Sequence, residues 1–312
     1  MADHLRPQLL FRSPLVAVYD VNCHAPCGSL SSEEESISHS VVFPRSGVFI
    51  KKVSDKDQLV AESTRVLFFN RHETYRVSHP ITGGDNCTAI HFQEEGLVDF
   101  LFFMDPFVAE TAGRPFRSAA ADSSASLVLN LHRLRRLLLT QRLGDPLVVE
   151  EICAALLADS VASAYERRSM IRPPIREATR RVHRDLVDRT RVVLARKFRD
   201  KLSLGKLARA VFSSPFHLAR VFRRETGTSL HRQLNRLRLR LALERLADGK
   251  PDLTMLALDL GFSSHGHFTQ AFRSEFGCAP SEFSRQRSSR GWPDMRALLK
   301  SAHAMNRHPT VL

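Results

Sequence analysis

The stretch FSSPFHLARVFRRETG, from Phe212 to Gly227, returns fifty residues later as FSSHGHFTQAFRSEFG, from Phe262 to Gly277. Eight of the sixteen paired positions are identical. In each copy a serine, Ser214 or Ser264, precedes apolar residues at helical spacing, and a glycine closes the run. Serine at the N-cap and glycine just past the last turn are common helix boundaries. The sequence therefore predicts the same short helix twice.

A shorter helix is predicted before each copy. In the first copy, LSLGKLARAV has Ser203 as an N-cap and would bury Leu204, Leu207 and Val211. In the second copy the short helix is formed by Leu253, Leu256, Ala257 and Leu260. Phe212-Ser213 and Gly261 supply the turns. A short helix, a tight turn and a second helix with a polar outer face are typical of a helix-turn-helix. The alternative is a duplicated helical hairpin that packs without contacting DNA.

A leucine-rich segment, Ser229 to Asp248, joins the two copies, with Leu230, Leu234, Leu237, Leu241 and Leu246 as its buried stripe. Twenty helical residues span about 30 Å. Successive major grooves on one face of B-DNA are about 34 Å apart. We therefore expect a rigid linker helix that holds two reading helices in adjacent grooves.

The positive charge of the chain lies around this repeat. Of 312 residues, 46 are Lys or Arg and 33 are Asp or Glu, a net charge of +13. Residues 176–290 hold 25 of the basic and 11 of the acidic side chains, a net of +14. A basic region beside a neutral one favours a polyanionic partner, nucleic acid before membrane. The alternative is a solvated helix surface.

The segment from about Arg184 to Arg287 resembles the AraC/XylS family of bacterial transcription regulators. The resemblance rests on LARAVFSSPFHLARVFRRETG, RLRLRLALERLADG and LALDLGFSSHGHFTQAFRSEFGCAPSEFSR. It implies two helix-turn-helix units bridged by a helix, with base contacts from Phe216, Ala219, Arg220, His265, Gly266, His267 and Gln270. Arg220 would suit guanine and Gln270 adenine, since neither Ala219 nor Gly266 offers a hydrogen-bonding side chain. Phe212 departs from the family, which often has a turn glycine there.

Phosphate contacts are expected from exposed basic and hydroxyl side chains of the same region, since such contacts position a protein without reading sequence. The candidates are Lys206, Arg209, Ser214, Arg223, Arg224, Arg236, Ser264 and Arg273. Arg238 and Arg240 are also basic, but lie beside the leucine stripe and could pack their stems on it. For each arginine the alternative is a solvated helix face.

The predicted fold class is α+β. Residues 1–120 contain short β-branched and aromatic segments broken by turns, which predict a sandwich or barrel and resemble the cupin-like sensory domain of many AraC/XylS regulators. Residues 121–172 are a helical linker whose stripe of Leu127, Leu131, Leu134 and Leu138 serves either a homodimer interface or packing against the barrel. Arg172-Pro173-Pro174 precedes the DNA-binding domain, 176–290. A tail, 291–312, holds a short helix near 294–302.

A small-molecule effector is expected in the N-terminal domain. Its polar contacts would come from the polar groups in otherwise apolar strands, namely Arg45, Asn70, Tyr75, Arg76, His79 and His91. An arginine there would suit a carboxylate ligand. The alternative is that these side chains point outward from their strands.

The five cysteines are scattered and odd in number, which favours reduced thiols in a cytoplasmic protein. Cys23 and Cys27 have a C-x3-C spacing, and with Cys87 or His39 they could bind zinc or sense redox state. No paired histidines followed by a glutamate occur before residue 120, so metal-cupin oxidation is disfavoured. We expect no cofactor and no catalytic residue.

Together with the family resemblance, these observations predict a bacterial transcription regulator that binds promoter DNA and responds to an effector. The resemblance implies activation through contact with RNA polymerase, and repression stays open. No secretory signal or membrane span is expected, because no basic-then-apolar leader and no run of eighteen apolar residues occurs. Two alternatives stay open. One is a zinc-thiolate repair methyltransferase of the Ada type, although that module needs a second close cysteine pair. The other is an architectural protein that binds DNA without sequence preference.

Overall fold

The computed structural model describes residues 5–54, 57–102, 113–140, 146–169, 177–249 and 251–288. The chain divides into two compact units, Met1–Val192 and Val193–Leu312. The boundary falls inside a helix, α4 (Glu177–Lys197). The linker prolines and the tail helix lie outside the described residues, and the four domain ranges stay predictions.

The N-terminal unit is built on an antiparallel sheet with the path β1-β2-β8-β4-β6-β9, on which β5 and β7 pair with β4, and β3 with β7. The strands are β1 Leu5–Arg12, β2 Val16–Cys23, β3 Glu34–Glu35, β4 His39–Lys52, β5 Gln58–Glu62, β6 Arg65–Phe69, β7 Thr74–Ser78, β8 Asp85–Phe92 and β9 Ala120–Asp122. The predicted α+β fold class is confirmed, because the strands lie in the N-terminal unit and the helices of the C-terminal unit follow them.

The long strand β4 organises this sheet because it changes partners along its length. Residues 39–47 pair with β8 across an irregularity at Pro44–Ser46, with β6 on the other side at 40–42, and residues 48–52 pair with β5 and, from Ile50, with β7. Gly47 follows with a φ of 79°. A Cβ at Gly47 would lie 2.2 Å from the Gly84 carbonyl oxygen, so only glycine fits this close approach.

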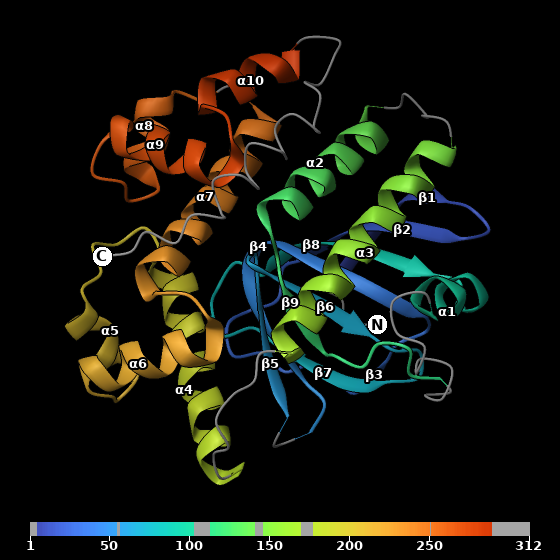
Figure 1. Cartoon of the computed structure of the whole chain (residues 1–312), viewed down its shortest axis with the longest axis horizontal. Helices are drawn as coiled ribbons and strands as arrows, with labels where there is room; N and C mark the ends of the chain where they lie inside the picture. Colours follow the sequence, from blue (N-terminus) through green and yellow to red (C-terminus); the bar gives the residue numbers. More distant parts are fainter. Residues whose placement is uncertain are drawn as a thin grey trace. The chain divides into compact units, whose positions relative to one another are not determined.

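Helices α1 (Glu94–Phe102), α2 (Ala125–Leu139) and α3 (Pro146–Ser169) follow or interrupt the strands. Figure 1 shows α2 and α3 side by side, and α3 also packs against β9. Leu127, Leu131 and Leu134 of the predicted stripe are at most 3% exposed within the single chain, while Leu138 is half-buried. Packing against the chain itself is therefore the role of this stripe, and a homodimer would use other residues.

The C-terminal unit is helical where it is described. After α4 it contains α5 (Leu204–Ala210), α6 (Pro215–Thr226), α7 (Leu230–Asp248), α8 (Leu253–Asp259), α9 (His265–Phe276) and α10 (Pro280–Ser288). Figure 1 shows α7 between the pair α5–α6 and the pair α8–α9, and α7 contacts α6, α9 and α10. Nineteen residues of α7 give a length of about 28 Å. Each predicted helix pair is confirmed.

In the part of the chain that the structure describes, no helix combines the length and apolar character needed to cross a bilayer.

Candidate nucleic-acid interface

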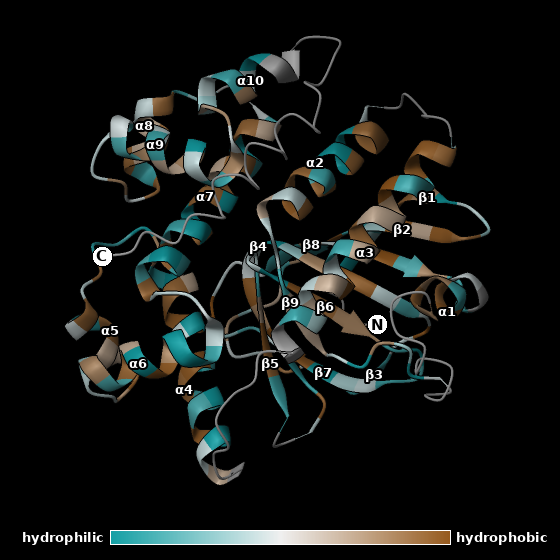
Figure 2. Cartoon of the chain, in the orientation of Figure 1, coloured by the Kyte–Doolittle hydropathy of each residue, from teal (hydrophilic) through white to brown (hydrophobic). Residues whose placement is uncertain are grey.

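Helix α6 has the ends that its sequence predicts. The Ser214 hydroxyl accepts a hydrogen bond from the His217 backbone N–H at 3.3 Å, and Pro215 takes the first helical position. Gly227 closes the helix with a φ of 71°. Leu218, Val221 and Phe222 are buried, which fixes the opposite face toward solvent. Brown and teal bands alternate along α6 in Figure 2.

Helix α9 repeats this construction. The Ser264 hydroxyl accepts from the His267 backbone N–H at 3.1 Å, and Gly277 ends the helix with a φ of 79°. Phe268, Phe272 and Phe276 are fully buried and lie with ring centroids 4.7–5.8 Å apart along the helix. The two helices therefore present matching faces to solvent.

The turns before these two helices differ. In both, one residue takes a left-handed backbone: Phe212, with a φ of 55°, before α6 and Gly261, with a φ of 82°, before α9. One residue separates Phe212 from Ser214, but two separate Gly261 from Ser264. The extra residue is Phe262, which is 3% exposed, whereas Phe212 is 91% exposed. Phe212 thus stands at a position that favours glycine.

The predicted base-contacting residues lie on the two solvent faces. Phe216 is 87% exposed, and Ala219 is half-buried. The other five, Arg220, His265, Gly266, His267 and Gln270, are exposed. Arg220 lies 3.4 Å from the ring of His217, and His267 lies 3.2 Å from the Ser263 hydroxyl. The structure brings each set together on one helix; contact with bases stays a prediction.

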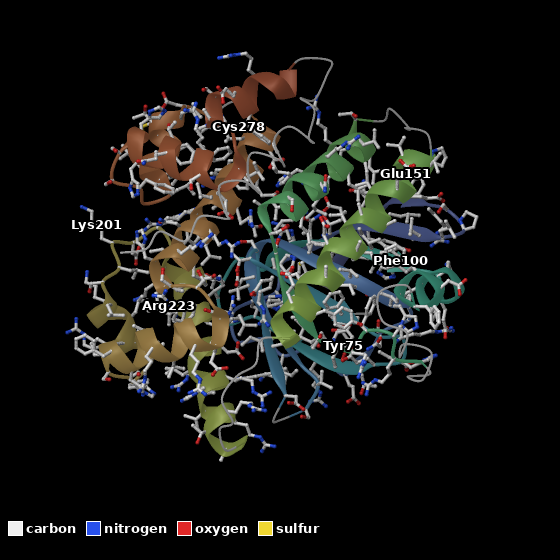
Figure 3. All side chains as sticks on the ribbon, in the orientation of Figure 1. Tyr75, Phe100, Glu151, Lys201, Arg223 and Cys278 are labelled. Carbon is white, nitrogen blue, oxygen red and sulfur yellow. The ribbon has the colours of Figure 1, made fainter. Side chains whose placement is uncertain are left out.

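Most predicted phosphate contacts also lie at the surface. Lys206, Arg209, Ser214, Arg223, Arg224, Ser264 and Arg273 are exposed. Figure 3 shows nitrogen-tipped side chains around α6, with Arg223 labelled. The hydroxyls of Ser214 and Ser264 already serve as helix caps. Arg273 lies 3.8 Å from Glu282, an exposed pair that leaves the guanidinium accessible.

Three arginines of α7, namely Arg236, Arg238 and Arg240, have partners within the unit. Arg240 is 2% exposed and lies 3.4 Å from Glu275 of α9, and Arg236 lies 3.3 Å from the same carboxylate. Arg238 donates to the backbone oxygens of Phe198 and Asp200. Burial would raise the pKa of Glu275, but Arg240 and Arg236 outweigh it and lower that pKa. Arg238 and Arg240 were considered as phosphate contacts. Because both are buried, they instead stabilise the packing of α7 within the unit.

Five of the six residues predicted for an effector pocket have separate partners within the unit. Arg45 pairs with Asp20, Asn70 bonds to the backbone of Phe116, and Tyr75 packs its ring on Phe69. His79 pairs with Asp85, and His91 bonds to Ser38. Arg76 is exposed. Burial lowers the pKa of His91 to about 4. An effector site made by these six stays a prediction.

A cavity in this unit lies elsewhere. It is lined by Phe68, Leu101, Pro115, Phe116, Arg117, Ser118, Val161, Ala164 and Tyr165, none of which was predicted from the sequence. Its volume is about 10 Å³, roughly the space that one water molecule needs. A ligand of several heavy atoms would have to open it.

The structure gives different surroundings to the residues that the sequence suggested for a zinc or redox site. Cys23 and Cys87 are buried, and Cys27 is exposed with its thiol 3.5 Å from the Pro80 carbonyl oxygen. His39 instead accepts from the backbone N–H of Arg71. Burial raises the pKa of both Cys23 and Cys87, which disfavours the thiolate that redox sensing requires. The strands place Cys23 beside His79 and Asp85, a grouping that the sequence analysis missed.

The comparisons with known proteins concern mainly the C-terminal unit. Residues 207–286 match a family model described as a helix-turn-helix domain. The probable transcriptional regulator LumQ of Photobacterium leiognathi is 26% identical over 183 residues, which cover 58% of this chain and 68% of LumQ. The transcriptional activator RhaS of Pectobacterium carotovorum is 37% identical over 98 residues, which cover 31% of this chain and 35% of RhaS. The match thus spans about a third of the length of RhaS.

A solved structure of a transcriptional regulator from Chromobacterium violaceum, with an AraC-type DNA-binding domain, is 27% identical and has a TM-score of 0.32. The match covers 35% of this chain and 96% of that one.

Proposed function

We propose that this chain, whose residues 207–286 match a helix-turn-helix family model, is a transcription regulator of the AraC/XylS type that reads promoter DNA with two helices in adjacent major grooves. The observation that carries the proposal is the pair α6 and α9. Each has the same serine N-cap and glycine end, each buries one apolar face, and each presents its polar face to solvent.

Charge supports this proposal. Residues 176–290 carry a net of +14, and the exposed basic side chains include Lys206, Arg209, Arg223 and Arg224 on α5 and α6. Such a surface attracts the phosphate backbone and positions a protein on DNA. Arg220 on α6 and Gln270 on α9 then have the donor geometry for guanine and adenine edges.

The length of α7 supports the two-groove arrangement. About 28 Å of helix separates the two readers, close to the groove repeat of about 34 Å. The arginines Arg236 and Arg240 tie α7 to α9 through Glu275, so this reader is held on its linker.

Activation is the proposed sign of regulation, since RhaS is described as a transcriptional activator. Contact with RNA polymerase is what the family resemblance implies. The N-terminal unit would sense a small-molecule effector. The repair-methyltransferase alternative gains no support from the matches, which are to regulators. Cys27 is exposed, but the other four cysteines are buried, and the sequence lacks the second close cysteine pair that such a repair module needs.

The test is a selection of bound fragments from sheared DNA of the source genome, with the purified full chain. We expect one motif of about two helical turns with two submotifs. The double variant Arg220→Ala/Gln270→Ala should lose the motif, whereas Arg133→Ala, an exposed arginine on α2, should keep it. Enrichment without a motif would contradict base reading and favour the architectural alternative.

A further inference from the structure

Four side chains with metal-binding atoms gather at one end of the β2–β8 ladder in the N-terminal unit. Cys23, His79 and Asp85 each offer an atom within 4.8 Å of the other two, and all three are buried. The Cys87 thiol donates to Asp85 Oδ2 at 3.0 Å, while His79 Nε2 lies 2.8 Å from Asp85 Oδ1. We call these four residues the Cys23 cluster. Asp85 thus directs one carboxylate oxygen toward His79 and the other toward Cys87.

Strand register explains why the cluster forms. Cys23 and Asp85 are directly opposite in the antiparallel pair β2–β8, and Cys87 follows Asp85 by two residues. Residues opposite each other, and residues two apart on one strand, share a face of the sheet. Cys23, Asp85 and Cys87 therefore project to the same side, and this arrangement needs no ligand to hold it.

The fourth residue is held by a tight loop. The backbone N–H of Gly28 donates to the His79 carbonyl oxygen at 2.8 Å, and the His79 N–H donates to Ser29 at 3.3 Å. A Cβ at Gly84 would lie 1.8 Å from the Cys23 carbonyl oxygen, so this turn lies directly against the end of β2. The segments that carry the four side chains are thus fixed to one another through their backbones.

We propose that the Cys23 cluster is a closed binding site for a zinc-class divalent cation, with Cys23, His79, Asp85 and Cys87 as its ligands. Metal binding would displace the thiol protons of Cys23 and Cys87, and the two resulting thiolates, an imidazole and a carboxylate are four ligands of the kinds that Zn²⁺ takes in tetrahedral sites. Zinc bond lengths of about 2.0–2.3 Å set ligand atoms roughly 3.3–3.8 Å apart. Cys23, His79 and Asp85 offer ligand atoms within 4.8 Å of one another, and Cys87 approaches this group through Asp85 at 3.0 Å, so side-chain rotation, most of all at Cys87, would have to bring the four atoms to zinc spacing.

The donor set also selects the class of metal. Mg²⁺ and Ca²⁺ prefer oxygen ligands throughout, and Cu(I) prefers thiolates and thioethers. A mixed sulfur, nitrogen and oxygen set suits Zn²⁺ or Co²⁺. All four side chains are less than 9% exposed, which leaves no open position for substrate. The site is therefore structural, joining β2, β8 and the loop that carries His79.

The first experiment measures metal in the full chain, purified without a metal-affinity tag. We expect about one equivalent of Zn²⁺ per chain, retained against a weak chelator. Replacement by Co²⁺ should give the intense visible bands of a tetrahedral site together with thiolate-to-cobalt charge transfer. A Co²⁺ spectrum without charge transfer would place the metal on surface histidines and overturn the proposal. The proposal would also be overturned if the chain bound no Zn²⁺ in competition with that chelator.

Variants then assign the ligands. Cys23→Ser and Asp85→Asn should each weaken Zn²⁺ binding at least tenfold, and Cys23→Ser should reduce the charge-transfer intensity. The matched control is Cys153→Ser, a buried cysteine on α3 outside the cluster, which should leave both unchanged. Cys27→Ser checks the exposed thiol near Pro80. Unchanged Zn²⁺ binding and charge transfer in Cys23→Ser would overturn the assignment, and the cobalt spectrum of the wild-type chain tests the site even if a variant fails to fold.

Discussion

Phe212 and Phe262 hold the same place in the sequence repeat but opposite places in the structure. Phe212 has a left-handed backbone and an exposed ring, whereas Phe262 is buried and packs its ring against Phe268 at 5.3 Å. The turn before α9 is one residue longer, which places Gly261 at the left-handed position and moves the phenylalanine into the core. Identity in a repeat therefore does not guarantee equivalent positions.

This difference predicts opposite effects of substitution. Phe212→Gly should raise the free energy of unfolding by about 1 kcal/mol, because a side chain in the left-handed region costs about 1–2 kcal/mol and this ring buries little. Phe262→Ala should lower it by about 3–5 kcal/mol through the cavity it leaves. Urea denaturation followed by circular dichroism measures both. A Phe212→Gly chain as unstable as Phe262→Ala would mean that the Phe212 ring is buried.

The features that the sequence could predict are local. Caps at Ser203, Ser214 and Ser264 and ends at Gly227 and Gly277 depend on a few neighbouring residues, so helix limits in the C-terminal unit followed from the sequence. The inner faces followed from helical spacing in the same way. Leu204 was expected to be buried but is 37% exposed, because it lies in the first turn of α5, at the edge of the packed face.

The features that the sequence missed depend on partners far along the chain. The Cys23 cluster requires the register of β2 on β8, which the spacing of residues within one strand does not reveal. For Arg240 the leucine stripe of α7 left two possibilities open, a phosphate contact or packing on the stripe. Its partner Glu275 lies on another helix, so the ion pair itself could not be predicted.

Arg220 and Arg223 should have different effects on DNA binding. Arg220→Ala should weaken binding to the selected site by about 1–3 kcal/mol and relax the preference at one base pair, since Arg220 is the proposed reader of a guanine. Arg223→Ala should weaken binding to all sequences and reduce the salt slope by about one, as expected for a phosphate contact. Fluorescence anisotropy across a salt series separates the two. An equal loss on random DNA for Arg220→Ala would contradict base reading.

Arg191 and Glu62 form a buried ion pair that joins α4 to the end of β5, at 2.5 Å with side chains 2% and 1% exposed. Arg191→Ala should lower the free energy of unfolding by about 3–5 kcal/mol, because it removes the arginine from a buried Glu62 charge that keeps only its other contacts, those from Thr64 among them. The double variant Arg191→Met/Glu62→Leu should lose less than the sum of the single changes.

Arg189→Ala is the matched control for this pair. Arg189 lies 3.0 Å from Asp185 on the same helix, but both side chains are about half exposed. Exposed pairs contribute at most about 1 kcal/mol, so this variant should be close to wild type. Equal effects of Arg189→Ala and Arg191→Ala in thermal denaturation would argue against the buried pair.

Glu275 should make the stability of the chain depend on pH. Burial opposes its ionisation, yet Arg240 and Arg236 lower its pKa in the folded state below the ordinary value of about 4.3. The carboxylate therefore stabilises the fold at pH values above that ordinary pKa, and this stabilisation is lost as the pH falls through the pKa of the folded state.

The variant Glu275→Gln should be less stable than wild type at neutral pH, and the difference in stability should shrink in acid. Melting temperatures between about pH 3 and 7 measure this, with Glu151→Gln, an exposed carboxylate on α3, as the control. If the melting temperatures of Glu275→Gln and wild type differ by the same amount at every pH in this range, the ion pairs of Glu275 with the two arginines do not contribute to stability.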